Sequence, residues 1–129
     1  MTLALLALAV WMPATNPDVS AEIKRLQPEV VIATYTGSTI TRQPGEAVVL
    51  LGEIGADNRV GVALSDGRVI VYQRTLERAI DYTRGHPLFR LAMARVIAHE
   101  LEHLRRGGPE HDKAGWFSRC PSKRDLVDR

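Results

Sequence analysis

The chain of 129 residues is poor in several features that mark particular classes of protein. It has one cysteine, Cys120, so no disulfide can form within it, and its redox compartment stays undecided. Aromatic residues make up 5% of the sequence, which leaves few side chains for stacking against the bases of a single strand. The net charge is only +2, with bases and acids interleaved, so no nucleic-acid partner is expected.

Long hydrophobic runs are also missing. A bilayer-spanning helix needs about 20 apolar residues, so no stable insertion into a membrane is expected. The apolar run at residues 3–11 fits either the hydrophobic part of a signal peptide or a buried first strand. Export and a cytoplasmic location are therefore equally compatible with the sequence. We divide the chain into residues 1–17, a signal peptide or N-terminal strand, and residues 18–129, a single domain.

Strand signals dominate the first part of that domain. Apolar or β-branched runs at residues 30–35 and 47–51 predict two short strands. Residues 60–64 and 68–72 flank the turn-forming sequence Ser-Asp-Gly at 65–67, which predicts a hairpin or two neighbouring strands.

Helical patterns lie before and after these strands. A short helix is predicted over residues 21–26, with Asp18 or Ser20 as its cap, and a second runs from Thr75 to about Arg84.

The longest helix is predicted from Pro87 to about Arg106, since proline suits a first helical turn. Its middle, residues 91–98, is apolar on nearly every side except at Arg95, as in a buried helix. We therefore predict an α/β (α+β) fold, in which a small mixed sheet packs on this helix.

The end of this helix carries the sequence His99-Glu100-Leu101-Glu102-His103. Residues four apart share a helical face, so two imidazoles at this spacing can each bind one Zn²⁺ at about 2.0–2.1 Å. Glu100 borders the same face, about 100° from His99 and about 60° from His103. Its carboxylate can take a proton from a zinc-bound water, whose pKa falls toward about 7, as that water attacks a carbonyl.

A complete zinc site needs a third protein ligand. Glycines at 107 and 108 and a proline at 109 end the helix and let the chain reverse, and His111 follows. No glutamate follows Glu110, so a distant Glu ligand from a second helix is excluded. Asp125 is the long-range alternative to His111.

The stretch from Val96 through His103, continued from His111 to Gly115, resembles small bacterial metzincin-like peptidases. Their pattern is HExxH, a glycine-containing loop, a third histidine and then a Met turn. The resemblance implies a minimal zincin-like domain with an edge strand near residues 61–63 that holds extended substrate. It implies that His99, His103 and His111 bind zinc, that Glu100 is the catalytic base, and that the substrate is a peptide or protein.

The sequence departs from this family at two places. His111 comes two residues later than in the commonest spacing, and Gly-Trp-Phe at 115–117 stands where the Met turn is expected. No methionine follows Met93. These departures leave an alternative function open, a zinc-binding regulatory or binding module that has lost catalytic turnover.

Five nearby residues receive weaker predictions. Glu102 is expected to face solvent, and His86 to be a loop or cap residue. Asp112 could accept a hydrogen bond from a ligand imidazole and so orient it, and a surface acid is an equally good interpretation. Tyr72 and Tyr82 are candidates for stabilising an oxyanion.

Overall fold

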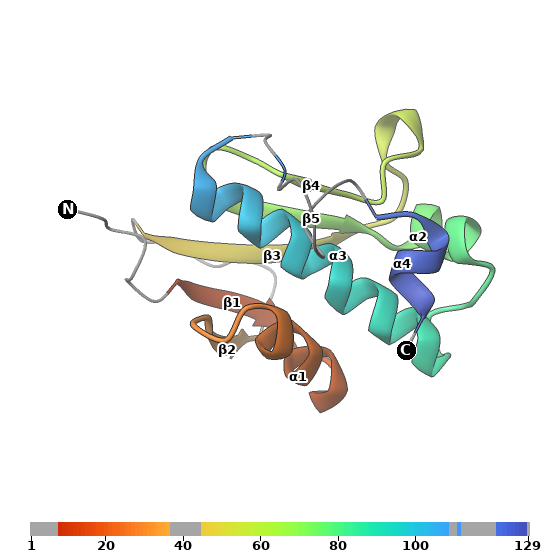
Figure 1. Ribbon diagram of the computed structural model, residues 1–129, viewed down its shortest axis with the longest axis horizontal. Coiled ribbons are helices and arrows are strands. Elements are labelled where there is room, and N and C mark those ends of the chain that lie inside the picture. The colour runs from red at the N-terminus through yellow and green to blue at the C-terminus, as the bar shows by residue number, and fades with distance from the viewer. Residues whose placement is uncertain (1–7, 37–44, 109–110, 112–120, 129) are drawn as a thin grey trace.

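The computed structural model describes residues 8–36, 45–108, 111 and 121–128. Within these residues the chain forms one five-stranded sheet, with helices packed on it (Figure 1). The elements follow in the order β1 (Ala9–Pro13), α1 (Pro17–Leu26), β2 (Val31–Tyr35), β3 (Glu46–Gly52), the 3-10 turn η2 (Ala56–Asn58), β4 (Gly61–Ala63), β5 (Arg68–Tyr72), α2 (Gln73–Ile80), α3 (Pro87–Arg106) and α4 (Lys123–Val127).

The sheet is mixed, with the strand order β2-β1-β3-β5-β4. The pairs β1–β2, β1–β3 and β3–β5 are parallel. β4 lies at one edge and runs antiparallel to β5. The predicted α/β class with a small mixed sheet is confirmed, and so is the hairpin.

The N-terminal apolar run contributes an interior strand. Residues 9–13 form β1, which pairs with β2 on one side and β3 on the other. Val10 and Met12 of this strand are each only 1% exposed. Residues 3–7 of the same run lie outside the described part of the chain.

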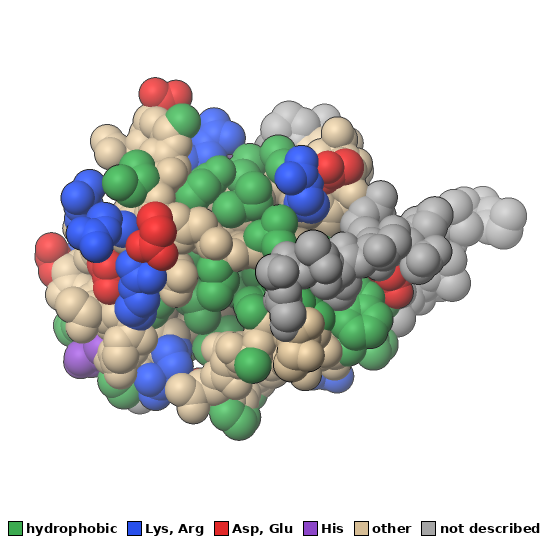
Figure 2. All heavy atoms as spheres, turned by 180° about the vertical axis from the view of Figure 1, so that it is seen from behind, with side chains coloured by type: hydrophobic (Ala, Val, Ile, Leu, Met, Phe, Trp, Pro, Cys, Tyr) green, Lys and Arg blue, Asp and Glu red, His purple; other side chains and the backbone are tan. Residues whose placement is uncertain are grey.

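α3 is the central helix of the core. It crosses the sheet on the same face as α1 (Figure 1), and its apolar side chains are buried there together with Val69 and Val71 of β5. The alternate residues of β5, Ile70 and Tyr72, are half-buried, because successive side chains of a strand point to opposite faces. Figure 2 shows the molecule from behind, where hydrophobic side chains gather across the middle.

The two short helices begin elsewhere than predicted. α1 begins at Pro17 with Asn16 as its N-cap, so neither Asp18 nor Ser20 caps it. A proline at the first position already has a helical φ, which explains the earlier start. The predicted cap role of Thr75 is also wrong, because β5 continues directly into α2 at Gln73.

Thr75 is instead buried inside α2, where its hydroxyl accepts a hydrogen bond of 3.0 Å from the Gly55 amide. α2 also ends earlier than predicted, at Ile80. Asp81 follows it in the left-handed conformation, with φ 63°.

The long helix is confirmed at both ends, from Pro87 to Arg106. His86 is its N-cap, as predicted for a cap residue, and its Nδ1 accepts a hydrogen bond of 3.0 Å from the Leu88 amide. Among the described residues, no helix combines the length and the apolar character needed to cross a membrane.

The contact between β4 and α3 leaves no room for a side chain at Gly61. A Cβ atom there would lie 2.5 Å from Cγ1 of Val96. We expect Gly61→Ala to lower the free energy of unfolding by about 1–3 kcal/mol, the usual cost of overpacking, in urea denaturation.

Gly85→Ala is the matched control, because a Cβ atom at Gly85 meets nothing within 4 Å. Its φ is not positive, so we expect the control to be neutral or to stabilise the fold by up to about 1 kcal/mol. Equal stability of the two variants would contradict a close contact between β4 and α3.

Candidate metal centre

The C-terminal half of α3 carries polar groups into the core. His99 is 2% exposed, and it belongs to the same helix as the apolar residues that cover the sheet. Glu100 and His103 are half-buried at the border of this buried face. A core helix therefore presents the two motif histidines and the glutamate at one end of the molecule.

The structure brings His99, His103 and His111 together. Nε2 of His99 lies 3.2 Å from Nε2 of His103 and 3.3 Å from Nε2 of His111. One nitrogen from each ring lies within 4.8 Å of the other two. The chain thus returns after α3 to place His111 beside the helical pair.

These separations suit a single zinc ion. Two nitrogens that each lie about 2.0–2.1 Å from one tetrahedral ion are separated by about 3.3–3.4 Å. The separations around His99 are close to this value. Three imidazoles are also a known zinc ligand set that leaves a fourth position open. The residues present therefore fit Zn²⁺.

The end of α3 fixes the orientation of one ring. Nδ1 of His103 lies 3.0 Å from the carbonyl oxygen of Gly108. Since a carbonyl only accepts, Nδ1 must carry the proton, which leaves the Nε2 lone pair directed at the cluster. Gly107 makes this turn with φ 76°, and its amide bonds the carbonyl of His103. The predicted helix stop therefore also orients an imidazole.

Burial keeps His99 neutral. Desolvation is the largest of the effects that lower the pKa of His99 to about 4, and the neighbouring rings of His103 and His111 contribute in the same direction. His99 is therefore an uncharged imidazole at neutral pH, which is the form that binds a metal.

Glu100 lies between α3 and the edge strand. Burial raises the pKa of its carboxyl group, while His103, Arg59 and the Ala63 backbone oppose that shift. A Cβ atom on Gly61 would come within 3.4 Å of Cγ of Glu100. The carboxylate therefore stands where β4 meets the motif helix.

The other predicted site residues lie elsewhere. Asp125 belongs to the capping box of α4, where its carboxylate accepts from Ser122, so it is not part of the histidine cluster. The Tyr72 ring packs against Gly52, and that of Tyr82 lies 4.5 Å from the His86 ring.

Two other predictions are not tested by the structure. Asp112 and the Gly-Trp-Phe sequence at 115–117, which stands in place of the Met turn, lie outside the described residues.

The prediction for Glu102 is wrong, because this carboxylate is 2% exposed. Burial raises its pKa, but hydrogen bonds from Arg105, Arg106 and Gln27 outweigh that effect and hold the pKa below its ordinary value. Glu102 is therefore a buried, ionised group. The spacing of Glu102 to the two arginines is visible in the sequence, whereas the contact with Gln27 is not.

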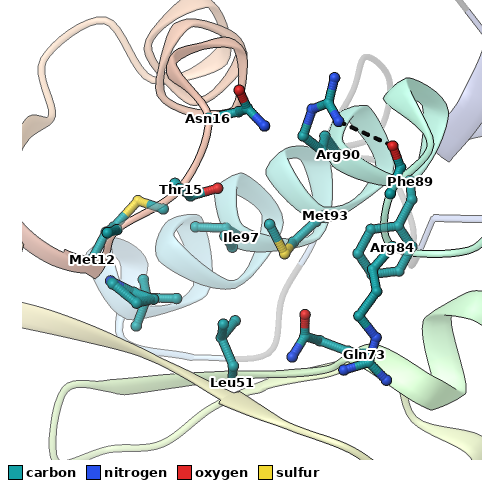
Figure 3. A pocket seen from close by; sticks show the side chains of 14 residues that line it. Met12, Thr15, Asn16, Leu51, Gln73, Arg84, Phe89, Arg90, Met93 and Ile97 are labelled. Carbon is teal, nitrogen blue, oxygen red and sulfur yellow. Dashed lines mark hydrogen bonds between the residues drawn. The ribbon is translucent and has the colours of Figure 1, made fainter. Parts of the chain in front are cut away.

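A pocket of about 290 Å³ lies along the other half of α3 (Figure 3). Met93 and Ile97 of α3 face Leu51 of β3 across it, and Gln73 and Arg84 lie at its border (Figure 3). None of the three histidines lines this pocket. It is therefore separate from the metal centre.

Comparisons with known proteins agree with this fold. No family model and no curated protein sequence matches the chain. The described architecture, a mixed sheet with an antiparallel edge strand packed on a long helix, is similar to that of a solved structure.

A similar solved structure is that of archaemetzincin from Archaeoglobus fulgidus, determined in complex with malonate. The two chains are 13% identical, with a TM-score of 0.55, and the match covers 94% of this chain and 90% of that one. At this identity the likeness establishes the fold.

The third position of the cluster can be tested by metal binding. We expect His111→Ala to weaken zinc binding about tenfold or more, because it removes one of three converging imidazoles. Asp125→Ala is the control and should bind zinc as the wild type does, losing only the cap of α4. The zinc affinities of the two variants are measured against a competing chelator. Weaker binding by Asp125→Ala than by His111→Ala would assign the third ligand to Asp125.

Proposed function

We propose that this protein is a zinc-dependent peptidase that hydrolyses peptide bonds within a peptide or protein substrate. The observation that carries the proposal is the convergence of Nε2 of His99 with the ring nitrogens of His103 and His111, beside Glu100. The three imidazoles would hold Zn²⁺, and Glu100 would be the general base.

Zinc supplies a Lewis acid that polarises a carbonyl and lowers the pKa of a bound water toward about 7. Glu100 does not belong to the ligand cluster, so its carboxylate is left to accept a proton. Its raised pKa suits that role, because a base acts best when its pKa approaches the working pH. The contact with β4 restricts where the carboxylate can move.

The edge strand supports an extended peptide as the substrate. Among the residues that the structure describes, β4 pairs with β5 on one side only, so its other side can form main-chain hydrogen bonds with a further strand. Glu100 lies next to Gly61 of this strand. A peptide bound along β4 would therefore run past the general base.

A zinc-binding module without turnover is the second candidate. It is favoured by the absence of any methionine after Met93, where metzincin-like peptidases have a Met turn. Both candidates bind zinc, so metal content does not separate them. The role of Glu100 does.

We expect Glu100→Gln to retain zinc and to lower peptide hydrolysis about 10²–10⁴-fold, the usual contribution of a general base. Hydrolysis is measured on an unstructured protein such as casein, with a chelator-treated sample as the blank. Glu53→Gln is the control, because this exposed carboxylate pairs with Arg84. The control should keep full activity.

Zinc-loaded wild type that cleaves no peptide would support the module without turnover. Equal activity of the wild type and Glu100→Gln would remove Glu100 from the reaction.

A further inference from the structure

An ionic cluster built on the buried carboxylate of Glu102 lies beside the metal centre and has no role in the chemistry above. Glu102 lies about 60° from His99 and about 100° from His103 around α3, on the side away from Glu100. Its carboxylate accepts from Nε of Arg106 at 2.6 Å, from Nε of Arg105 at 3.0 Å and from the Gln27 amide at 2.9 Å.

Gln27 links this cluster to α1. It is the C-cap of α1 and is 4% exposed. Its Nε2 donates both to Glu102 and to the backbone carbonyl of Ala98, at 3.2 Å. These two acceptors bracket one turn of α3, and His99 lies within that turn. Arg105 and Arg106 bind the same carboxylate from the turn that follows His103.

The cluster is one step in a ladder between two parallel helices. Residues of α1 and of the segment after it bind residues of α3 in the same order along both stretches of chain. These contacts therefore fix the position of α3 along its own axis relative to α1. The four steps are Asp18–Arg90 at 2.9 Å, Glu22–Arg95 at 2.9 Å, Gln27–Glu102 at 2.9 Å and Glu29–Arg105 at 3.3 Å.

Packing alone does not require an ionised group at position 102. Burying the carboxylate costs its desolvation, and the ion pairs that offset this cost often stabilise a fold no more than an apolar side chain of the same volume would. What the charged cluster adds is geometry, since hydrogen bonds hold the helix at defined points. Metal ligands need this, because they must sit within about 0.5 Å of their binding positions.

We propose that Glu102 is a positioning residue of the metal centre. Through its hydrogen bond with Gln27 it holds the turns of α3 that carry His99 and His103 in place, and so keeps the ring nitrogens of the two histidines convergent. This inference rests on the proposed function in one respect, that the histidine cluster binds a metal. It does not require that the protein hydrolyse peptides.

The test compares two variants, each of which removes the charge of one acidic residue in the ladder. Glu102→Gln removes the charge that binds both arginines beside the site. Glu22→Gln, the matched control, removes the charge that binds Arg95 seven residues earlier on the same face of α3. Co²⁺ is the probe, since it binds such nitrogen sites and its visible absorption reports the ligand geometry.

We expect both variants to melt at a lower temperature than the wild type, and only Glu102→Gln to lose about tenfold in Co²⁺ affinity and to change its visible spectrum. Equal affinities and spectra for the two variants would overturn the proposal and make Glu102 a purely structural residue. Should Glu102→Gln fail to fold, Gln27→Met takes its place, because it removes the amide and keeps the volume. It should show a smaller loss of affinity that is still absent in Glu22→Gln.

The results that would contradict this proposal differ from those that would contradict the proposed function. A wild type that binds Co²⁺ but cleaves no peptide contradicts the peptidase alone. A wild type that binds no Co²⁺ contradicts both.

Discussion

Nε2 of His99 lies a little over 3 Å from Nε2 of both His103 and His111, and a positive charge on the buried His99 ring is therefore disfavoured beside them. The lowered pKa of His99 is the first consequence, since burial and two neighbouring rings both favour its neutral form. Ring nitrogens with convergent lone pairs attract a cation. The rest of the structure is arranged so that this cluster can exist at the end of a buried helix.

Three structural features maintain the cluster. The apolar length of α3 anchors it to the sheet, so that His99 is drawn into the core. The left-handed Gly107 ends the helix and lets the Gly108 carbonyl orient His103. Glu102 and Gln27 tie the same turns to α1 on the far side. On the remaining side, β4 contacts α3 at Gly61, and Glu100 therefore lies beside this edge strand.

Much of this could be predicted from local sequence signals. The length and ends of α3, the hairpin and the third histidine followed from helix periodicity, Pro87, the glycines after Arg106 and the spacing of His111. Each of these features depends on residues that lie within about a dozen positions of one another in the sequence. The order of the strands depends on contacts between distant segments, and the sequence did not give it.

Two errors share that cause. Thr75 was predicted to start a helix, but its hydroxyl accepts a hydrogen bond from Gly55, twenty residues earlier. Glu102 was predicted to face solvent, but it is buried. Its burial depends on Gln27, which is 75 residues away in the chain. A local pattern contains no information about such a partner.

The most direct test of the account is to locate the metal in crystals of the zinc-loaded protein by anomalous scattering at the zinc absorption edge. The account predicts one ion per chain, bound by ring nitrogens of His99, His103 and His111 at about 2.0–2.1 Å, with a fourth position not occupied by protein. An ion bound elsewhere, or no ion at this cluster at saturating zinc, would contradict it.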